Sequence, residues 1–385
     1  MKGANFLEKL LDDQPVEWKK LGEVAELKRG KTITQKEAQK GNFPVISGGQ
    51  KPAYYINQFN REGQTITIAG SGAYAGFVQY WEEPIFVSDA FSIKANEEYV
   101  LAKFIYHFLL NIQDKLYHLK RGSGVPHVYA KDVAEFPIPI PPLSVQSRIV
   151  EILDKFTSLE AELEAELDCR KRQYIYYREL LLDFSQHNNI QWKKLGEVFI
   201  TRNGYTPSKS NPEYWEGGTI PWYRMEDIRE NGRILSDALQ HITPKGVKGN
   251  RLFKADSIIL ATSATIGEHA LITTKALANQ RFTNFEIKED FKEKLLPKFV
   301  FYYFYVIDDW CKNHIYIGNF PSVDVEQVKK MDFPLPPLSE QQRIVEILDK
   351  FDTLTNSISE GLPLEIQLRR QQYEYYREQL LDFRR

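Results

Sequence analysis

Basic side chains beside glycine and hydroxyl residues are the groups in this sequence whose type and spacing could do chemistry. Residues 28–31 read Lys-Arg-Gly-Lys, and residues 120–124 read Lys-Arg-Gly-Ser-Gly. In the second half, residues 202–204 read Arg-Asn-Gly and residues 245–251 carry three further cations. Lysine and arginine bind phosphate oxygens, so this pattern predicts phosphate contacts, although a solvated surface loop remains the alternative for any single residue. The candidate positions are Lys28, Arg29, Lys31, Lys120, Arg121, Ser123, Arg202, Asn203, Arg224, Lys245, Lys248 and Arg251.

Patterns that would indicate catalysis are incomplete. Residues 70–77 read GSGAYAGF, which is rich in glycine but lacks the lysine of a nucleotide-phosphate loop. Residues 211–214 read NPEY, which is similar to the Asn-Pro-Pro-Tyr motif of adenine methyltransferases except that glutamate replaces the second proline. We interpret this segment as a turn near a strand. The seven histidines show no metal-ligand spacing, and the two cysteines build neither a disulfide framework nor a zinc cluster. We expect no metal site and no catalytic residue.

The elements that position these residues are written twice in the chain. WKKLGEV occurs at 18–24 and again at 192–198. PPLSVQSRIVEILDKF (141–156) returns as PPLSEQQRIVEILDKF (336–351), and QYIYYRELLLDF (173–184) returns as QYEYYREQLLDF (372–383). Two variable regions lie between these repeated blocks. They match only faintly, as in FPVI (43–46) against IPWY (220–223) and GVPHV (124–128) against NFPSV (319–323). The order variable, repeated, variable, repeated predicts two halves in a pseudo-twofold arrangement.

Each repeated block begins with a proline-rich segment and continues as a long helix. FPIPIPPL (136–143) and FPLPPL (333–338) predict connectors or edge strands, because proline removes backbone donors. Ser144 and Ser339 follow them as expected N-caps. Apolar residues then recur every three or four positions, as in a coiled-coil seam, and we predict a break where Gly361 and Pro363 interrupt the second helix. The residues expected to pair the helices are Ile149, Leu153, Phe156, Leu163, Leu167, Tyr174, Ile344, Leu348, Phe351, Ile358 and Tyr373. Separate packing of each helix on its neighbouring domain is the alternative.

Length and charge set the remaining limits. A chain of 385 residues suggests two or three domains, and a net charge of −2 argues against a polybasic protein. The charge is unevenly distributed: residues 1–144 and 185–335 carry +1 and +2, whereas 145–184 and 336–385 carry −3 and −2. The N-terminal segment has acids and no long apolar run, so we expect no signal peptide, no membrane span and a cytoplasmic location.

Together, the repeated segments resemble the specificity subunit of type I restriction–modification enzymes. The resemblance rests on WKKLGEV, PPLSEQQRIVEILDKF, LEAELEAELD (159–168), QYEYYRE and NPEYWEGGTIPW (211–222), and it covers the whole chain in the same order. It implies an α+β fold with two mixed α/β target-recognition domains separated by two long helices that pair as an antiparallel coiled coil. The boundaries we expect are 1–143 and 185–338 for the domains, and 144–184 and 339–385 for the helical regions.

The resemblance also implies function. Each recognition domain would read one half of a split, asymmetric site in double-stranded DNA, and the helices would set the spacer. Two modification (methyltransferase) subunits and possibly restriction (translocase-nuclease) subunits would be partners. Those partners, and not this chain, would bind S-adenosylmethionine, ATP and Mg²⁺. An interaction scaffold without DNA contacts, or a fused methyltransferase with its own cofactor, are the competing interpretations.

Overall fold

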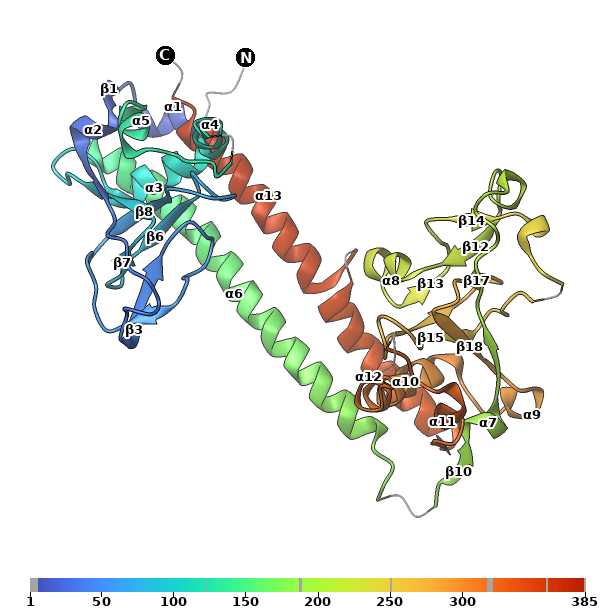
Figure 1. Cartoon of the computed structure of the whole chain (residues 1–385). Helices are drawn as coiled ribbons and strands as arrows, with labels where there is room; N and C mark the ends of the chain where they lie inside the picture. The colour runs from blue at the N-terminus through green and yellow to red at the C-terminus, as the bar shows by residue number, and fades with distance from the viewer. Residues whose placement is uncertain are drawn as a thin grey trace. The chain divides into compact units, whose positions relative to one another are not determined.

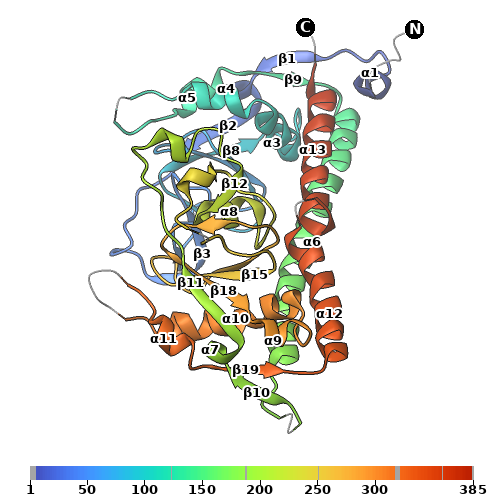
Figure 2. The same cartoon turned by 90° about the vertical axis from the view of Figure 1, so that its right-hand side faces the viewer.

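The chain forms two compact units that each combine a mixed domain with helical segments from both repeats. A computed structural model describes residues 6–122, 124–186, 189–249, 251–316, 321–357 and 359–383. Unit 1 contains residues 1–164 and 365–385, and unit 2 contains residues 165–364. Figures 1 and 2 show the elements of each unit. No helix among the described residues is long and apolar enough to cross a membrane.

The domain of unit 1 is built on a four-stranded antiparallel sheet in the order β2-β8-β5-β6. A three-stranded sheet, β4-β3-β7, and the two-stranded pair β1-β9 complete it. The expected proline strand is therefore confirmed as β9, which pairs antiparallel with β1. The strands are β1 (Glu17–Lys20), β2 (Ala25–Arg29), β3 (Lys40–Ile46), β4 (Tyr55–Ile56), β5 (Thr65–Ala69), β6 (Val78–Trp81), β7 (Phe86–Val87), β8 (Ala90–Ala95) and β9 (Pro137–Ile140).

The domain of unit 2 repeats this plan with additions. Its main sheet has the order β11-β18-β15-β16-β13, its second sheet is β14-β12-β17, and the proline strand β19 pairs with β10. FPVI and IPWY fall on β3 and β12, the middle strands of equivalent sheets, so this faint match was structural. The strands are β10 (Gln191–Lys194), β11 (Phe199–Asn203), β12 (Ile220–Tyr223), β13 (Ile234–Leu235), β14 (His241–Ile242), β15 (Ser257–Ala261), β16 (His269–Ile272), β17 (Leu277–Ala278), β18 (Phe282–Ile287) and β19 (Asp332–Leu335).

Short helices cover these sheets, and long helices carry the repeated blocks. NPEY forms the turn η1, where the Asn211 side chain accepts a hydrogen bond from the Glu213 amide, as the turn interpretation predicts. The helices are α1 (Phe6–Leu11), α2 (Leu21–Val24), α3 (Ala102–Asn111), α4 (Gln113–His118), α5 (Ala130–Ala134), α6 (Leu143–Leu182), α7 (Leu195–Val198), η1 (Pro212–Tyr214), α8 (Met225–Asn231), η2 (Pro244–Gly246), α9 (Glu289–Lys292), α10 (Pro297–Asn313), α11 (Val325–Val328), α12 (Leu338–Asn356) and α13 (Gly361–Leu381).

The N-caps predicted for the long helices are wrong. Helix α12 begins at Leu338 with Pro337 as its N-cap, and no side chain caps it. The carbonyl of Pro337 already accepts from the amides of Glu340 and Gln341, so Ser339 lies inside the first turn. Pro142 does the same for α6, which begins at Leu143, so Ser144 is not a cap either. Proline has a φ close to the helical value, which lets the first turn form directly after it.

A buried glutamine fixes the start of each long helix to its domain. The Gln146 amide accepts from the Leu101 N–H at 2.9 Å and donates to the carbonyls of Tyr99 and Pro141 at 2.9 and 2.8 Å. Gln341 makes the same three bonds 195 residues later, with Leu296, Lys294 and Pro336. Both side chains are fully buried. Each amide therefore satisfies the backbone in front of the domain's main helix, α3 or α10, and orients α6 or α12 against it.

Within unit 1, α6 and α13 run antiparallel and lie side by side (Figures 1 and 2). The ring of Phe156 stacks on Tyr376 at 5.2 Å, and Arg370 pairs with Glu160 and Glu164 further along α6. Ile149, Leu153 and Tyr373 are buried in the core of this unit. Within unit 2, Tyr174 and Tyr177 stack on Phe351, and Ile344 and Leu348 are buried. Leu163 and Leu167 are half-buried, and Ile358 lies outside the described residues.

The predicted break in the second helical region is confirmed. Helix α12 ends at Asn356, Ser357 is extended, and α13 begins at Gly361. Gly361 has a φ of +80°, and a Cβ there would lie 2.4 Å from the carbonyl oxygen of Thr353. Glycine is therefore needed for the chain to turn into α13, and Pro363 then occupies the first turn, where its missing N–H costs no hydrogen bond.

The glutamine anchor gives a stability prediction. Gln341→Ala removes the side-chain partner of one partly buried amide and of two carbonyls, so we expect a loss of about 2–4 kcal/mol in unfolding free energy. The matched control is Gln342→Ala on the same helix, whose exposed side chain donates a hydrogen bond to Glu346. This control should change stability by less than about 0.5 kcal/mol. Denaturant unfolding followed by tryptophan fluorescence measures both, and equal midpoints for the two variants would contradict the anchor.

Candidate nucleic-acid interface

In unit 1, the first basic cluster lies where β2 ends against the turn between β7 and β8. The amides of Gly30 and Lys31 donate to the carbonyls of Ala90 and Val87, each at 2.9 Å. A Cβ at Gly30 would lie 2.2 Å from the carbonyl oxygen of Ser88, so only glycine permits this approach of the two backbones. We call this close approach of the two backbones the crossing. It leaves the side chains of Lys28, Arg29 and Lys31 exposed beside the turn.

Unit 2 builds the same crossing with different side chains. The amides of Gly204 and Tyr205 donate to the carbonyls of Phe282 and Ala278, again at 2.9 Å each. A Cβ at Gly204 would lie 2.3 Å from the carbonyl oxygen of Asn279. Arg202 therefore stands exposed at the equivalent place, at the end of β11. The sequence match between the two basic glycine segments reflects a shared backbone constraint as well as shared charge.

The glycine-rich loop 70–76 lies beside this crossing in unit 1. The Gly70 N–H donates to the carbonyl of Asp89 at 3.2 Å, and the Gly72 N–H donates to the carbonyl of Pro126 at 3.0 Å. Gly72 and Gly76 have positive φ values of 83° and 89°. Backbone hydrogen bonds thus hold this loop on one side to the turn between β7 and β8, and on the other side to the segment that contains Pro126. The glycines that resemble an incomplete nucleotide-binding motif in the sequence therefore form a turn.

The equivalent loop of unit 2 is held in the same way. The Thr262 N–H donates to the carbonyl of Arg281, and the Val323 N–H donates to the carbonyl of Thr262, both at 2.9 Å. Ser263 bridges Ser322 as Ser71 bridges His127 in unit 1. Within the described residues, the faint match therefore marks equivalent backbone positions at 127–128 and 322–323. Each domain gathers a strand end, a turn and two loops at one end.

The candidate cations divide into those held by neighbours and those left exposed. The Lys120 ammonium donates to the carbonyl of Ala73 at 2.9 Å and lies 4.5 Å from the Tyr117 ring centroid, so it helps to hold the glycine-rich loop. Arg121 pairs with Asp132 at 3.3 Å, and Lys245 pairs with Glu213 at 3.2 Å. The structure assigns no ion pair to the exposed side chains of a second group, within the described residues: Lys28, Arg29, Lys31, Arg202, Lys248 and Arg251.

Three further candidates have separate placements. Arg224 is the N-cap residue of α8, where its N–H donates to the buried carboxylate of Asp227 at 2.7 Å and its side chain lies 3.9 Å from Glu226. Asn203 accepts from the Thr283 hydroxyl at 2.9 Å. Ser123 lies outside the described residues. The loop of Lys245 and Lys248 joins this region through Tyr205, whose hydroxyl accepts from the Lys248 amide at 2.6 Å.

Sequence reasoning missed two arginines at these ends. The Arg61 guanidinium donates to the Ser92 hydroxyl at 2.6 Å and to the carbonyls of Lys28 and Arg29, so it fastens the end of β2. Burial is the main cause that lowers the pKa of Arg61. Arg281 is exposed in the turn before β18. Arg281 stands beside no glycine, which was the main signal used for the other cations. Arg61 lies two residues before Gly63, the same spacing as Arg202 before Gly204, so this signal could have found it. Alignment of β8 with β18 would have identified Arg281 as the counterpart of Asp89.

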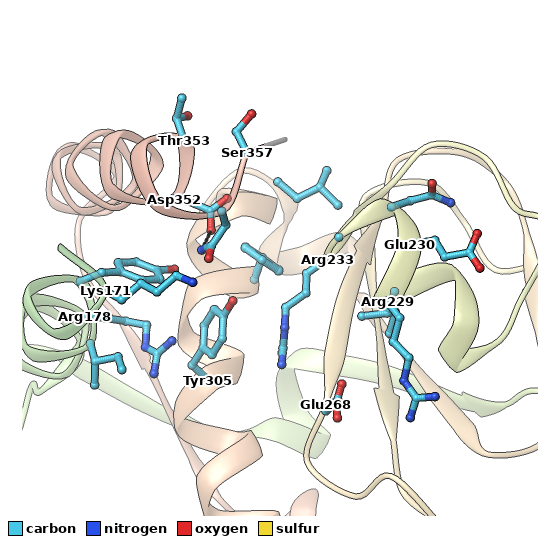
Figure 3. Close-up of a pocket in the computed structure, with 18 of the residues that line it drawn as sticks. Lys171, Arg178, Arg229, Glu230, Arg233, Glu268, Tyr305, Asp352, Thr353 and Ser357 are labelled. Carbon is cyan, nitrogen blue, oxygen red and sulfur yellow. Dashed lines mark hydrogen bonds between the residues drawn. The ribbon is translucent and has the colours of Figure 1, made fainter. Parts of the chain in front are cut away.

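Unit 2 also has a pocket of about 860 Å³, lined by α6, α8, α10 and the end of α12. Figure 3 shows Tyr305 between Arg178 and Arg233, whose guanidinium carbons lie 4.0 and 5.0 Å from the ring centroid. Arg233 in turn donates to the buried carboxylate of Asp308 at 3.1 Å, which His269 also contacts at 2.7 Å. The lining mixes basic and acidic groups around this network. The contact of Arg178 on α6 with Tyr305 on α10 holds α6 against the domain of unit 2.

Comparisons with known proteins agree with this architecture. A family model described as the type I restriction modification DNA specificity domain matches residues 15–168 and 188–368. The EcoR124I/EcoR124II type I restriction enzyme specificity subunit of Escherichia coli is 34% identical over 411 residues, covering 100% of this chain and 98% of that protein. The EcoprrI specificity subunit of the same species is 47% identical over 215 residues, covering 54% of this chain and 53% of that protein.

Solved structures show the same fold. The S subunit of a type I restriction–modification system from M. genitalium aligns with a TM-score of 0.61 at 16% identity, covering 97% of this chain and 98% of that one. The expected fold of two mixed domains with paired long helices is confirmed by this match and by the contacts above. With the family model matching most of the sequence in two copies, this chain belongs to the type I restriction–modification DNA specificity family.

Proposed function

We propose that this chain is the non-catalytic subunit that recognises a bipartite, asymmetric site in double-stranded DNA, with each recognition domain reading one half. The observation that carries the proposal is the repeated framework of strand end, turn and loops, on which the two units place different side chains. Identical readers would require a palindromic site, whereas divergent readers on one framework suit an asymmetric site. We place the recognition domains at 1–143 and 185–338 and the helical regions at 144–184 and 339–385.

The exposed cations would contact phosphates, and polar side chains of the loops would read base edges. Phosphate contacts fix register without carrying sequence information, which suits the cluster at 28–31 and Arg202. Base edges are fully distinguishable only in the major groove. A net charge of −2 is compatible with this function because partner subunits can supply much of the electrostatic affinity.

We infer that two modification (methyltransferase) subunits dock on the helices, and that restriction subunits can join them. Support comes from exposed aromatic residues that the helices repeat: Tyr176 on α6 is 60% exposed, and Tyr375 on α13, 199 positions later, is 58% exposed. Two equivalent apolar surfaces suit two copies of one partner. Methylation of a base within a duplex requires base flipping, which we assign to these partners together with S-adenosylmethionine, ATP and Mg²⁺. From this proposed DNA target we infer a cytoplasmic location.

The experiment that tests the function is selection from randomised duplex DNA by the full chain in complex with its modification subunits. Enrichment of a split motif with a fixed gap is the expected result. If a soluble complex enriched no motif, the result would contradict DNA recognition and favour an interaction scaffold. Binding of S-adenosylmethionine by the isolated chain would instead favour the fused-methyltransferase alternative.

The exposed cluster gives a salt-dependence prediction. Replacing Lys28, Arg29 and Lys31 together by alanine should weaken DNA binding, because each lost phosphate contact lowers the slope of log affinity against log salt by about 0.9. The matched control is Lys20→Ala in the same unit, since Lys20 pairs with Glu135 at 2.6 Å. Binding titrations at several salt concentrations measure both slopes. If the triple variant had the same salt-dependence slope as the unaltered complex, these three residues would make no phosphate contacts and would be an ordinary solvated surface.

The helices give a spacing prediction. One further Leu-Glu-Ala-Glu unit within residues 159–168 would lengthen α6 by about 6 Å. This increase equals at most about two base-pair steps of roughly 3.4 Å each. We expect DNA selection to return a longer gap between unchanged half-sites. The control keeps the length and exchanges Glu162, which is exposed on the same helix, for glutamine. A gap of unchanged length in the insertion variant would disprove the role of the helices as a spacer.

A further inference from the structure

The turn before β8 carries an acid in unit 1, and the equivalent turn before β18 carries a base in unit 2. The carbonyl of Asp89 accepts from the amide that follows β5, and the carbonyl of Arg281 accepts from the amide that follows β15. The next residue of each turn, Ala90 or Phe282, accepts from the amide of the crossing glycine, Gly30 or Gly204. Asp89 and Arg281 therefore occupy equivalent backbone positions, 192 residues apart, and carry opposite charges.

Backbone hydrogen bonds hold both residues, while their side chains stay accessible. The Arg281 N–H donates to the Asn279 side chain at 3.0 Å, and its carbonyl accepts from the Thr262 amide at 2.9 Å. The Arg281 side chain is exposed, and the structure gives it no ion pair within the described residues. The Asp89 carboxylate is half-buried and accepts a hydrogen bond from the Ser71 hydroxyl. One of its oxygens is thereby oriented, and the carboxylate keeps capacity to accept from a ligand.

We propose that Asp89 and Arg281 are specificity-determining residues that read base edges, one in each half-site. This inference rests on the proposed function. A carboxylate accepts from the amino group of cytosine, and a guanidinium donates two hydrogen bonds to O6 and N7 of guanine. Asp89 therefore selects a C·G pair in the half-site of unit 1, and Arg281 selects a G·C pair in the half-site of unit 2.

The negative charge of Asp89 distinguishes a contact with a base from a contact with a phosphate. A carboxylate that faced the DNA backbone would be repelled by phosphate, so the Asp89 oxygen that does not accept from Ser71 suits a donor on a base and not a phosphate. The neighbouring segment 28–31 supplies the cations that the backbone requires. Arg281 inherits the same position through the repeated framework, which argues for base contact by this arginine as well.

Two substitutions with matched shapes test the proposal in the full complex by selection from randomised duplex DNA. Arg281→Gln should lower the preference for guanine at one position of one half-site by about tenfold to a hundredfold and favour adenine, because an amide pairs with N6 and N7 of adenine. Asp89→Asn keeps an acceptor for Ser71 and should shift one position of the other half-site from cytosine towards adenine. The other half-site and the gap should stay unchanged in each case.

The control is Arg229→Gln, which removes one exposed arginine from α8 of unit 2 and should leave every position of the motif unchanged. Uniform weakening by Arg281→Gln without a change in base preference would overturn the inference in favour of a phosphate contact. An unaltered motif in both variants would overturn it while the proposed function stands. If the unaltered complex selected no split motif, the proposed function and the inference would both fail.

Discussion

The burial of α6 in two different cores is the interaction on which the rest of this structure depends. The first turns of α6 place Ile149 and Leu153 in the core of unit 1, and its last residues place Leu182 in the core of unit 2. The end of α13 returns Leu380 and Leu381 to unit 1. Each such side chain contributes about 1.5–3 kcal/mol when buried. Neither core is complete without residues from both repeats, so the helices are parts of the domains and not linkers between them.

This sharing explains how the ends of the sheets that carry the candidate contacts can keep one backbone arrangement in two divergent sequences. The glutamine anchors orient the helices against α3 and α10, and these helices pack on the sheets whose strand ends carry the candidate contacts. At those ends the framework consists mainly of backbone hydrogen bonds and one crossing glycine per unit, Gly30 or Gly204, and in unit 1 the side chains of Arg61 and Lys120 add contacts to it. The exposed Arg281 side chain has no ion pair within the described residues, whereas the Asp89 carboxylate adds one hydrogen bond, from Ser71. Because backbone groups make the other contacts of these two positions, we expect their identities to change with little effect on the fold.

The sequence alone predicted what depends on local pattern and repetition. The long helices, the proline strands and the break at Gly361 and Pro363 all follow from residue type and spacing. The caps at Ser144 and Ser339 were mistaken because the preceding proline carbonyls begin the helices. Contacts between residues far apart in the sequence left no local signal: His107 Nδ1 lies 3.1 Å from the hydroxyl of Tyr373, 266 positions away. Arg281 was missed for another reason, because no glycine stands beside it. Such contacts emerge only when the topology brings the strands and helices together.

The differences between the two repeats carry as much meaning as their likeness. Unit 2 adds α8 and β13, and the second helical region is divided into α12, which ends at Asn356, and α13, which begins at Gly361, whereas α6 is continuous from Leu143 to Leu182. In unit 1, Arg370 can pair with two glutamates of that continuous helix, whereas the equivalent Lys171 lines the pocket of unit 2. A reader of a palindrome would gain nothing from such asymmetry. Two unlike readers that share one supporting framework allow each half to change separately, which is what recognition of an asymmetric site requires.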